Sequence, residues 1–192
     1  MNEIGYEKII SDNGIKIGCI FGSSCVLFVK VGQGESLFEF DERYLRLAAE
    51  VNEKFGYTVV VSETAGDGRE DYQREMDAVG ELFSGNEYEI YYMGISKGGL
   101  IGLWYGADNE RVRRVLAVNP PLMINFYNRS VPAIKRLTEG RVKLVFGSLD
   151  PSYPFVPYVK EYSSVQIIEG ADHNFTDMTE CLIKIAEDFA AL

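Results

Sequence analysis

The sequence predicts an α/β fold with a mainly parallel sheet and helices on both of its faces. Short apolar runs of strand length alternate with longer segments whose apolar residues recur at helical spacing. This alternation is typical of parallel sheets, because each connecting helix packs back onto the sheet. The chain opens differently, with two strand-like runs around a tight-turn signal that predict an antiparallel hairpin. No repeat or linker interrupts the 192 residues, so we expect a single domain over 1–192.

The hairpin is the first expected element. Strand-like runs at 4–10 and 15–21 flank Asp12-Asn13-Gly14, and an Asn-Gly pair favours the tight turns that join antiparallel strands. A third strand is expected at 25–31, where almost every residue is apolar, as in strands that are buried on both faces. The glycine-rich segment Gly32-Gln33-Gly34 ends this strand.

Helices and strands then alternate up to the middle of the chain. A helix is expected over 40–55, ended by Gly56, and another over 70–84, because the apolar residues of each fall on one helical face. Strands are expected at 57–62 and 88–93. The two apolar faces consist of Tyr44, Leu47, Ala48, Val51 and Phe55 in the first helix and Tyr72, Met76, Val79 and Phe83 in the second.

The second half continues the same pattern and ends on a helix. Asn174 or Thr176 is expected to cap that last helix, because short polar side chains accept hydrogen bonds from the free amides of a first turn. The expected elements are helices at 98–106, 131–138, 154–162 (weak, with two prolines) and 176–190, and strands at 112–118, 142–146 and 165–168.

Composition and charge exclude several classes of function. The chain has 29 Asp and Glu residues against 19 Lys and Arg, and a net charge of −10 has the wrong sign for a nucleic-acid partner. No apolar run approaches the roughly 18 residues of a membrane span, and the start shows no basic-then-apolar signal pattern. Three scattered cysteines suggest no disulfide framework and favour a cytoplasmic protein, and a lone histidine without a ligand cluster argues against a metal site.

The strongest chemical signal is the segment Gly94-Ile95-Ser96-Lys97-Gly98, which matches G-x-S-x-G. It follows the expected strand 88–93 and opens the expected helix 98–106, which is the setting that this motif requires. A sharp strand-to-helix turn lifts the serine hydroxyl above the sheet, and the glycines leave room for that turn. The helix also directs its positive N-terminal end toward any negative charge that develops there. The alternative interpretation of Ser96 is an ordinary turn serine.

A serine needs a base, and the base needs an acid that orients it. The only histidine, His173, follows the last expected strand, and Asp150 follows the strand before it. Ligands of open parallel sheets bind beyond the carboxyl ends of the strands, so both residues lie where chemistry is expected. The alternatives are a surface histidine and an Asp-Pro turn. Asp172 is a neighbour of His173 that is badly placed to orient the ring, and we expect it to brace the loop.

With these residues in this order, the chain resembles small α/β-hydrolase-fold proteins. The resemblance covers nearly the whole chain and includes FGSLDPSYP and EGADHNF, which are similar to the acid and histidine loops of esterases and serine-peptidase-like hydrolases. It implies an eight-stranded sheet with an N-terminal antiparallel hairpin and no cap domain. It also implies acyl transfer to water through a covalent acyl-Ser96 intermediate, with Ser96, Asp150 and His173 as the catalytic residues and with no cofactor.

The resemblance further implies two backbone donors for an oxyanion. Many members carry His-Gly at the end of the third strand, and the next backbone N–H is one donor. Here the corresponding stretch, Val31-Gly32-Gln33-Gly34-Glu35, has the glycine and lacks the histidine. We expect the donors to be the backbone N–H groups of Gln33 and Lys97. The alternative for the glycine-rich stretch is a plain flexible turn.

The substrate site is expected to be shallow and open. Only residues 119–141 separate the sixth and seventh strands, which leaves room for a short helix and none for a cap. Gly32, Met123 and Phe126 are expected to line the site, although the last two residues would simply pack the helix in an alternative interpretation. Glu63 follows a strand carboxyl end, as does Asp67, and a carboxylate there would attract a cationic group such as a peptide amine.

These features support one leading hypothesis and two rivals. The leading hypothesis is a serine hydrolase that cleaves a small ester. Its expected partner is a small-molecule acyl substrate, with no nucleic-acid or membrane partner, and the sequence does not indicate its oligomeric state. The first rival is an aminopeptidase- or amidase-type hydrolase with the same three catalytic residues, using Glu63 or Asp67 to hold the amine. The second is a non-catalytic binding protein that retains the fold, consistent with the missing His-Gly.

Overall fold

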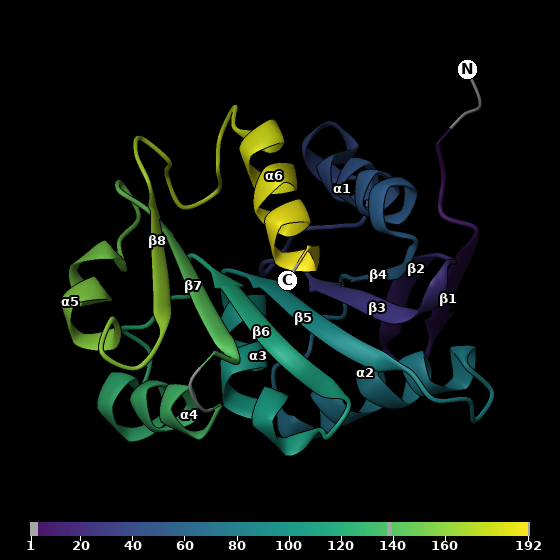
Figure 1. Ribbon diagram of the computed structural model, residues 1–192, viewed down its shortest axis with the longest axis horizontal. Coiled ribbons are helices and arrows are strands. Elements are labelled where there is room, and N and C mark those ends of the chain that lie inside the picture. Colours follow the sequence, from purple (N-terminus) through teal and green to yellow (C-terminus); the bar gives the residue numbers. More distant parts are fainter. Residues whose placement is uncertain (1–3, 138–139, 192) are drawn as a thin grey trace.

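The computed structural model describes residues 4–137 and 140–191, and the strands within these ranges form one eight-stranded sheet (Figure 1). Their spatial order is β1-β2-β4-β3-β5-β6-β7-β8, and only the pairs β1–β2 and β2–β4 are antiparallel. The mainly parallel sheet with an antiparallel opening is therefore confirmed. The strands are β1 (Lys8–Asp12), β2 (Ile15–Ile20), β3 (Ser23–Lys30), β4 (Tyr57–Ser62), β5 (Glu89–Ile95), β6 (Val112–Val118), β7 (Val142–Gly147) and β8 (Ser164–Ile168).

The hairpin turns on two residues with left-handed backbone conformations. Asn13 has φ 49° and Gly14 has φ 77°, and Asp12 pairs with Ile15 across the turn. Asn and Gly adopt these angles at the lowest cost, which explains why the dipeptide ends β1. The expected start of this strand at residue 4 is wrong. β1 begins at Lys8, which pairs with Cys19, and β2 ends one residue later at Ile20, so residues 4–6 have no residue of β2 opposite them.

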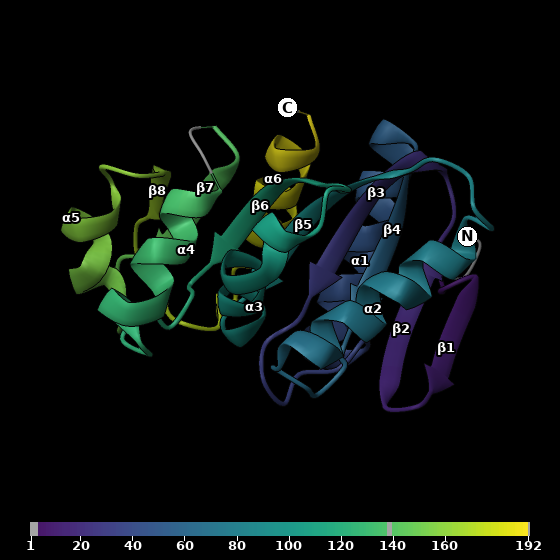
Figure 2. The ribbon, with the colours of Figure 1, turned by 90° about the horizontal axis from the view of Figure 1, so that it is seen from below.

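The helices form one layer on each face of the sheet (Figure 2). α1 and α6 cover one face, where Leu27 and Val29 of β3 point, and α2 to α5 cover the other, where Val26 and Phe28 point. This alternation along β3 explains why its sequence is apolar throughout. None of the described helices is long and apolar enough to cross a membrane. The helices are α1 (Glu39–Phe55), α2 (Arg69–Leu82), α3 (Lys97–Tyr105), α4 (Val131–Arg136), α5 (Val156–Val159) and α6 (Thr179–Ala190).

The ends of the helices confirm one expectation and contradict another. Gly56 ends α1 in a left-handed conformation with φ 67°, as its sequence position predicts. The last helix starts later than expected, at Thr179, and its N-cap residue Met178 makes no side-chain capping bond. The expectation that Asn174 or Thr176 caps α6 is therefore wrong. The backbone amides of both residues instead donate to the carboxylate of Asp172 in the loop before the helix.

The short helices after β6 and β7 are less regular than their sequences predict. A π-helical turn, η2 (Phe126–Ser130), precedes α4, and a 3₁₀ turn, η3 (Tyr153–Phe155), precedes α5. Proline lies near the start of both α4 and α5, where its missing N–H costs no helical hydrogen bond. These short elements leave the carboxyl edge of the sheet without a covering domain in the described part of the chain.

A buried ion pair fixes the end of β3, directly before the loop that was expected to hold the oxyanion. The Lys30 ammonium lies 2.7 Å from a carboxylate oxygen of Glu75 on α2, and both side chains are almost completely buried. Lys30 also donates to the carbonyl of Thr64 at 2.5 Å, and the Ser62 hydroxyl donates to the same Glu75 oxygen. Burial raises the pKa of Glu75, while the ammonium opposes that rise. The pair connects β3, the end of β4 and α2.

We predict that Lys30→Met destabilises the protein by about 3–5 kcal/mol, because it leaves the Glu75 carboxylate buried without its cation. The free energy of unfolding from urea titrations measures this effect. The double variant Lys30→Met/Glu75→Leu should recover most of the loss, since no buried charge then needs a partner. Equal losses in the single and double variants would contradict this interpretation of the pair.

Candidate active site

Ser96 lies at a tight turn between β5 and α3. Its backbone has φ 50° and ψ −119°, a conformation that non-glycine residues rarely adopt. The turn is compact because Gly94 packs against the backbone of Gly98, and Gly98 packs against the backbone carbonyl of Lys30. A side chain at either glycine would overlap backbone atoms, so the spacing of the motif follows from packing. The Ser96 amide donates to the carbonyl of Val118 at 2.8 Å, which attaches the turn to β6.

The structure brings the three expected catalytic residues together. Ser96 Oγ lies 2.8 Å from His173 Nε2, and His173 Nδ1 lies 2.5 Å from Asp150 Oδ2. The three residues come from three separate loops: the turn after β5, the turn after β7 and the loop after β8. Because β5, β6, β7 and β8 are successive parallel strands, their carboxyl ends share one edge of the sheet. A hydroxyl, an imidazole and a carboxylate in this order can pass a proton from the serine to the ring.

Asp150 is held rigidly and away from solvent. Its side chain is completely buried, and its second carboxylate oxygen accepts the backbone N–H of Ser152 at 2.6 Å. The Asp150 amide donates to the carbonyl of Gly147 at 3.1 Å, which closes the turn after β7. Since each carboxylate oxygen has a donor, the buried charge is compensated and the imidazole faces a fixed partner. Pro151 directly follows this turn, as the Asp-Pro signal suggested.

Asn119 is a part of the site that the sequence analysis missed. It is fully buried at the end of β6, and its amide nitrogen donates to the carbonyls of Asp172 and His173 at 2.9 and 3.0 Å. Its amide oxygen accepts the N–H of Gly147 at 2.8 Å. One side chain thus ties the acid turn to the histidine loop. The available signal was a polar residue directly after an apolar strand, at the carboxyl edge of the sheet.

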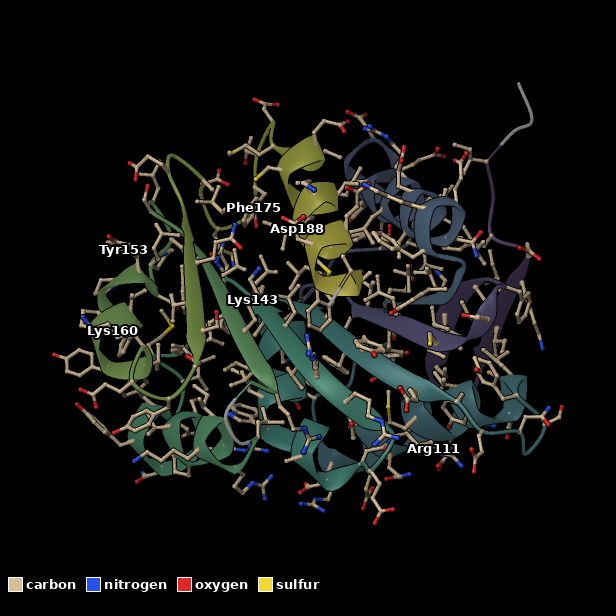
Figure 3. All side chains as sticks on the ribbon, viewed as in Figure 1. Arg111, Lys143, Tyr153, Lys160, Phe175 and Asp188 are labelled. Atoms are coloured by element: carbon tan, nitrogen blue, oxygen red, sulfur yellow. The ribbon has the colours of Figure 1, made fainter. Side chains whose placement is uncertain are left out.

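The loop that carries His173 is braced from both sides. Asp172 accepts the backbone N–H groups of Asn174 and Thr176 at 3.1 and 2.9 Å, which confirms its expected loop-bracing role. Hydrogen bonds with Thr176 lower the pKa of this half-buried carboxylate. Phe175, on the loop between β8 and α6 in Figure 3, is buried in the core cluster shared by α1 and α6. The imidazole is therefore presented by an ordered loop.

The electrostatic environment favours the protonated form of the imidazole. The hydrogen bond with Asp150 raises the pKa of His173 above its ordinary value, and partial burial of the ring opposes this rise. The negative charge of Asp150 and then that of Glu35 act in the same direction as the hydrogen bond. About a third of the His173 side chain remains exposed at 36%, so the ring can reach a bound substrate and water.

The two backbone amides expected to hold an oxyanion are free of protein acceptors. Among the described residues, neither the N–H of Gln33 nor that of Lys97 donates to another group of the protein. Lys97 is the first residue of α3, where helix amides have no internal partner and the helix dipole is positive. Gln33 lies in the turn after β3, and together with Ser96 and His173 it lines one cavity.

This cavity has a volume of about 480 Å³. Gly32 lines it, in agreement with its expected position, and Glu35 and Glu39 contribute two carboxylates to its wall. A second cavity of about 450 Å³ is lined by the same turn and is also bordered by Glu63 and Lys97. The lining of the first cavity consists of Gly32, Gln33, Gly34, Glu35, Glu39, Ser96, His173 and Asn174.

The acidic residues proposed to hold an amine are engaged with other groups. One oxygen of Glu63 accepts the N–H of Leu37 at 2.6 Å, and the other pairs with Lys16. Asp67 pairs with Lys97 at 2.8 Å. Glu63 therefore borders the second cavity with both oxygens occupied, and neither carboxylate faces Ser96 as a free anion.

Met123 and Phe126 lie elsewhere, contrary to their expected position on the wall of the site. Phe126 is buried against Phe155 and Tyr158, with a ring-centroid distance of 4.8 Å to the former. Met123 is exposed at the surface, where its sulfur accepts a hydrogen bond from Ser152. Neither residue lines the cavity at Ser96. Phe126 fits the alternative interpretation, in which these apolar residues pack the short helical segment, because its side chain belongs to the buried core cluster.

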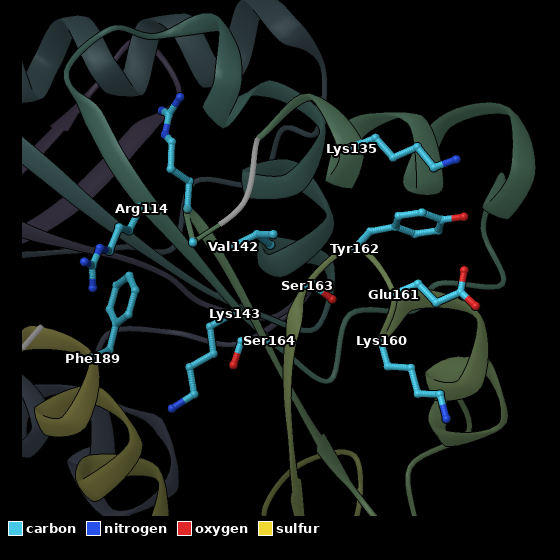
Figure 4. Close-up of a pocket in the computed structure, with 12 residues that line it drawn as sticks. Arg114, Lys135, Val142, Lys143, Lys160, Glu161, Tyr162, Ser163, Ser164 and Phe189 are labelled. Carbon is cyan, nitrogen blue, oxygen red and sulfur yellow. The ribbon is translucent and has the colours of Figure 1, made fainter.

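Another cavity lies at the opposite edge of the sheet (Figure 4). It has a volume of about 600 Å³ and is bordered by Val142 and Ser164 at the starts of β7 and β8. Parallel strands place their starts and ends at opposite edges, so this cavity is remote from Ser96. Its basic lining residues are Arg114, Lys135, Arg141, Lys143 and Lys160.

Comparisons with known proteins rest on structure, since no family model and no curated protein matches the chain. Est1E from Butyrivibrio proteoclasticus superposes with a TM-score of 0.71 at 17% identity, covering 96% of this chain and 97% of that one. An alpha-beta serine hydrolase homologue from Coxiella burnetii gives 0.70 at 17%, covering 97% and 99%. A serine hydrolase without a lid from Xanthomonas campestris gives 0.65 at 15%, covering 92% and 88%. The chain therefore has the α/β-hydrolase fold.

Proposed function

We propose that this protein is a serine hydrolase that cleaves small carboxylic esters. The observation that carries the proposal is the alignment of Ser96 Oγ, the His173 ring and the Asp150 carboxylate, with separations of 2.8 and 2.5 Å. The fold supports it, because Ser96 occupies the strained turn between β5 and α3 above the carboxyl edge of the sheet. The free amides of Gln33 and Lys97 supply donors near the same hydroxyl.

In the proposed reaction, Ser96 Oγ attacks the ester carbonyl carbon while His173 Nε2 takes the hydroxyl proton. Asp150 keeps the proton of the ring on Nδ1 and stabilises the imidazolium that forms. The negative oxygen of the tetrahedral intermediate accepts hydrogen bonds from the backbone of Gln33 and Lys97. His173 then gives its proton to the departing alcohol, leaving acyl-Ser96. Water attacks the acyl group in the second half, with His173 as the base, and restores the hydroxyl.

The site favours small esters without a negative charge. The segment between β6 and β7 contains only η2 and α4 among its described residues, so no inserted domain closes over Ser96. The exposed Glu39 borders the cavity, and the protein carries a net charge of −10, so anionic substrates are repelled. The engaged carboxylates of Glu63 and Asp67 favour an ester over a peptide with a free amine.

We predict that a fluorophosphonate probe labels wild-type protein and fails to label Ser96→Ala. Hydrolysis of p-nitrophenyl acetate should fall by at least about 10³-fold in this variant, because the nucleophile is lost. Mass spectrometry of the labelled peptide and the release of p-nitrophenol measure the two effects. Ser11→Ala, on the edge strand β1, is the matched control and should keep both properties. A folded wild-type protein that neither labels nor turns over would favour the non-catalytic alternative.

We also predict that the His173 ring titrates above the ordinary histidine pKa of about 6.5. The base must be neutral to accept the serine proton, so kcat/KM should rise with pH through this raised pKa. Asp150→Asn should lower the pKa and reduce kcat by about 10⁴-fold, since the carboxylate that favours the charged ring is lost. His173 is the only histidine, so NMR titration reports it directly. Asp188→Asn, on α6, is the control, and an unchanged pKa in Asp150→Asn would contradict the pairing.

Substrate class is tested with a panel of p-nitrophenyl esters and aminoacyl p-nitroanilides. We expect acetyl and butyryl esters to have the highest kcat/KM, and a succinyl ester to be poorer because its carboxylate meets an acidic cavity. The disadvantage of the succinyl ester should shrink at high ionic strength, since salt screens the repulsion. Anilides cleaved faster than esters would instead support the aminopeptidase- or amidase-type alternative.

A further inference from the structure

The turn after β3 is closed by a carboxylate of its own sequence. Glu35 Oε2 accepts the backbone N–H of Gly32 at 2.7 Å, while the Glu35 N–H donates to the Gly32 carbonyl at 3.2 Å. The second bond makes residues 32–35 a β-turn, and Gly34 at its third position has φ 82°. A Cβ atom on Gly32 would lie 2.8 Å from Glu35 Oε2, so the missing side chain at Gly32 makes room for this carboxylate.

These two bonds fix the direction of the Gln33 amide. The peptide between Gly32 and Gln33 is planar, and none of the described peptide bonds is cis. In a trans peptide the N–H points opposite to the C=O. The Gly32 carbonyl points into the turn toward the Glu35 amide, so the Gln33 N–H points out of it. Gln33 lines the cavity with Ser96, and its outward N–H is the proposed oxyanion donor.

Glu35 is in turn held by two buried residues of α1. Arg43 Nη2 donates to Glu35 Oε1 at 2.7 Å, and the Tyr44 hydroxyl donates to Glu35 Oε2. Arg43 and Tyr44 are 2% and 0% exposed, and the Glu35 side chain is only 11% exposed. Arg43 Nη1 also donates to the carbonyl of Asn174 at 2.6 Å, next to His173. One guanidinium therefore connects the turn after β3 to the loop that carries the imidazole.

Arg43 also compensates the negative charge of Glu35. An isolated carboxylate beside a forming oxyanion would repel it, and the repulsion would be strong in a partly buried site. The guanidinium lies 2.7 Å from Glu35 Oε1 and compensates the charge of Glu35, while Oε2 accepts the Gly32 N–H. The carboxylate can therefore serve as a fixed acceptor for the Gly32 amide at a small electrostatic cost to the reaction.

We propose that Glu35 is a positioning residue that holds the Gln33 amide in its oxyanion-binding direction, and that Arg43 couples this turn to the His173 loop. This inference rests on the proposed esterase function. Glu35 touches no reacting atom in the proposed mechanism and acts through the Gly32–Gln33 peptide. Loss of the carboxylate should free the turn, so that the transition state loses a donor while binding of the neutral ester is nearly unchanged.

The test compares Glu35→Gln, Glu35→Ala and Arg43→Lys with wild-type protein, using p-nitrophenyl acetate. Kinetics are recorded on the alkaline plateau of each pH profile, which separates positioning from any change in the His173 pKa. Glu35→Ala should lower kcat by about 10²-fold, the cost of weakening one oxyanion donor, with KM within about twofold. Glu35→Gln keeps an acceptor oxygen for the Gly32 amide and should lose less. Glu42→Gln, which removes an exposed carboxylate beside Arg43, is the matched control and should behave as wild type.

A second readout is inhibition by an aryl trifluoromethyl ketone, which forms an oxyanion on Ser96. The affinity for the ketone should fall in Glu35→Ala by a factor similar to the fall in kcat. If Glu35 had a purely structural role, the changes in ketone affinity and in kcat would be unrelated. Circular dichroism checks folding, and the isosteric Glu35→Gln serves if Glu35→Ala fails to fold. Glu35 variants with kcat and ketone affinity equal to those of Glu42→Gln would overturn this inference alone. A wild-type protein without esterase activity would overturn it together with the proposed function.

Discussion

Close backbone packing at the turn between β5 and α3 is the constraint on which the rest of the site depends. Gly98 rests against the carbonyl of Lys30 on β3, and the Ser96 amide is bonded to Val118 on β6. The turn is therefore held by both neighbours of β5, and these contacts maintain the positive φ of Ser96. With the hydroxyl fixed above the sheet, the loops after β7 and β8 need only deliver a carboxylate and an imidazole to the same edge.

Buried charge is the second organising feature, and each buried charged side chain within residues 4–137 and 140–191 lies beside a partner. Glu75 is paired with Lys30, Glu35 with Arg43, and Asp150 with the His173 ring. The first two pairs connect β3 and the turn after it to α2 and α1, and the third connects the turn after β7 to the loop after β8. Unpaired carboxylates would be costly there, because burial disfavours charge. A protein with a net charge of −10 thus keeps a few acids inside as fixed hydrogen-bond acceptors.

The elements of the fold followed closely from sequence patterns. The strand at 57–62 and the strand at 112–118 have the expected bounds, because uniform apolar runs with β-branched residues have few alternatives in a parallel sheet. The errors occur at ends and in short segments. The start of α6 was expected too early, because Asn174 and Thr176 have the short polar side chains that are typical of N-cap residues. In the structure both residues lie in the loop before the helix, where their backbone amides donate to the carboxylate of Asp172. Phe126 looked like a lining residue, although apolar loop residues also fill the core.

Sequence alone determined the order of the elements, the G-x-S-x-G turn and the two strand ends where an acid and a base would lie, because these depend on local periodicity and on glycine sterics. It also identified Gln33 and Lys97 as amides at such strand ends. Only the tertiary structure decided which side chains support them. Asn119 bridging two loops, and Arg43 joining Glu35 to the carbonyl of Asn174, are contacts between distant segments. Such contacts depend on how helices and strands pack in three dimensions, and no spacing along the chain records them.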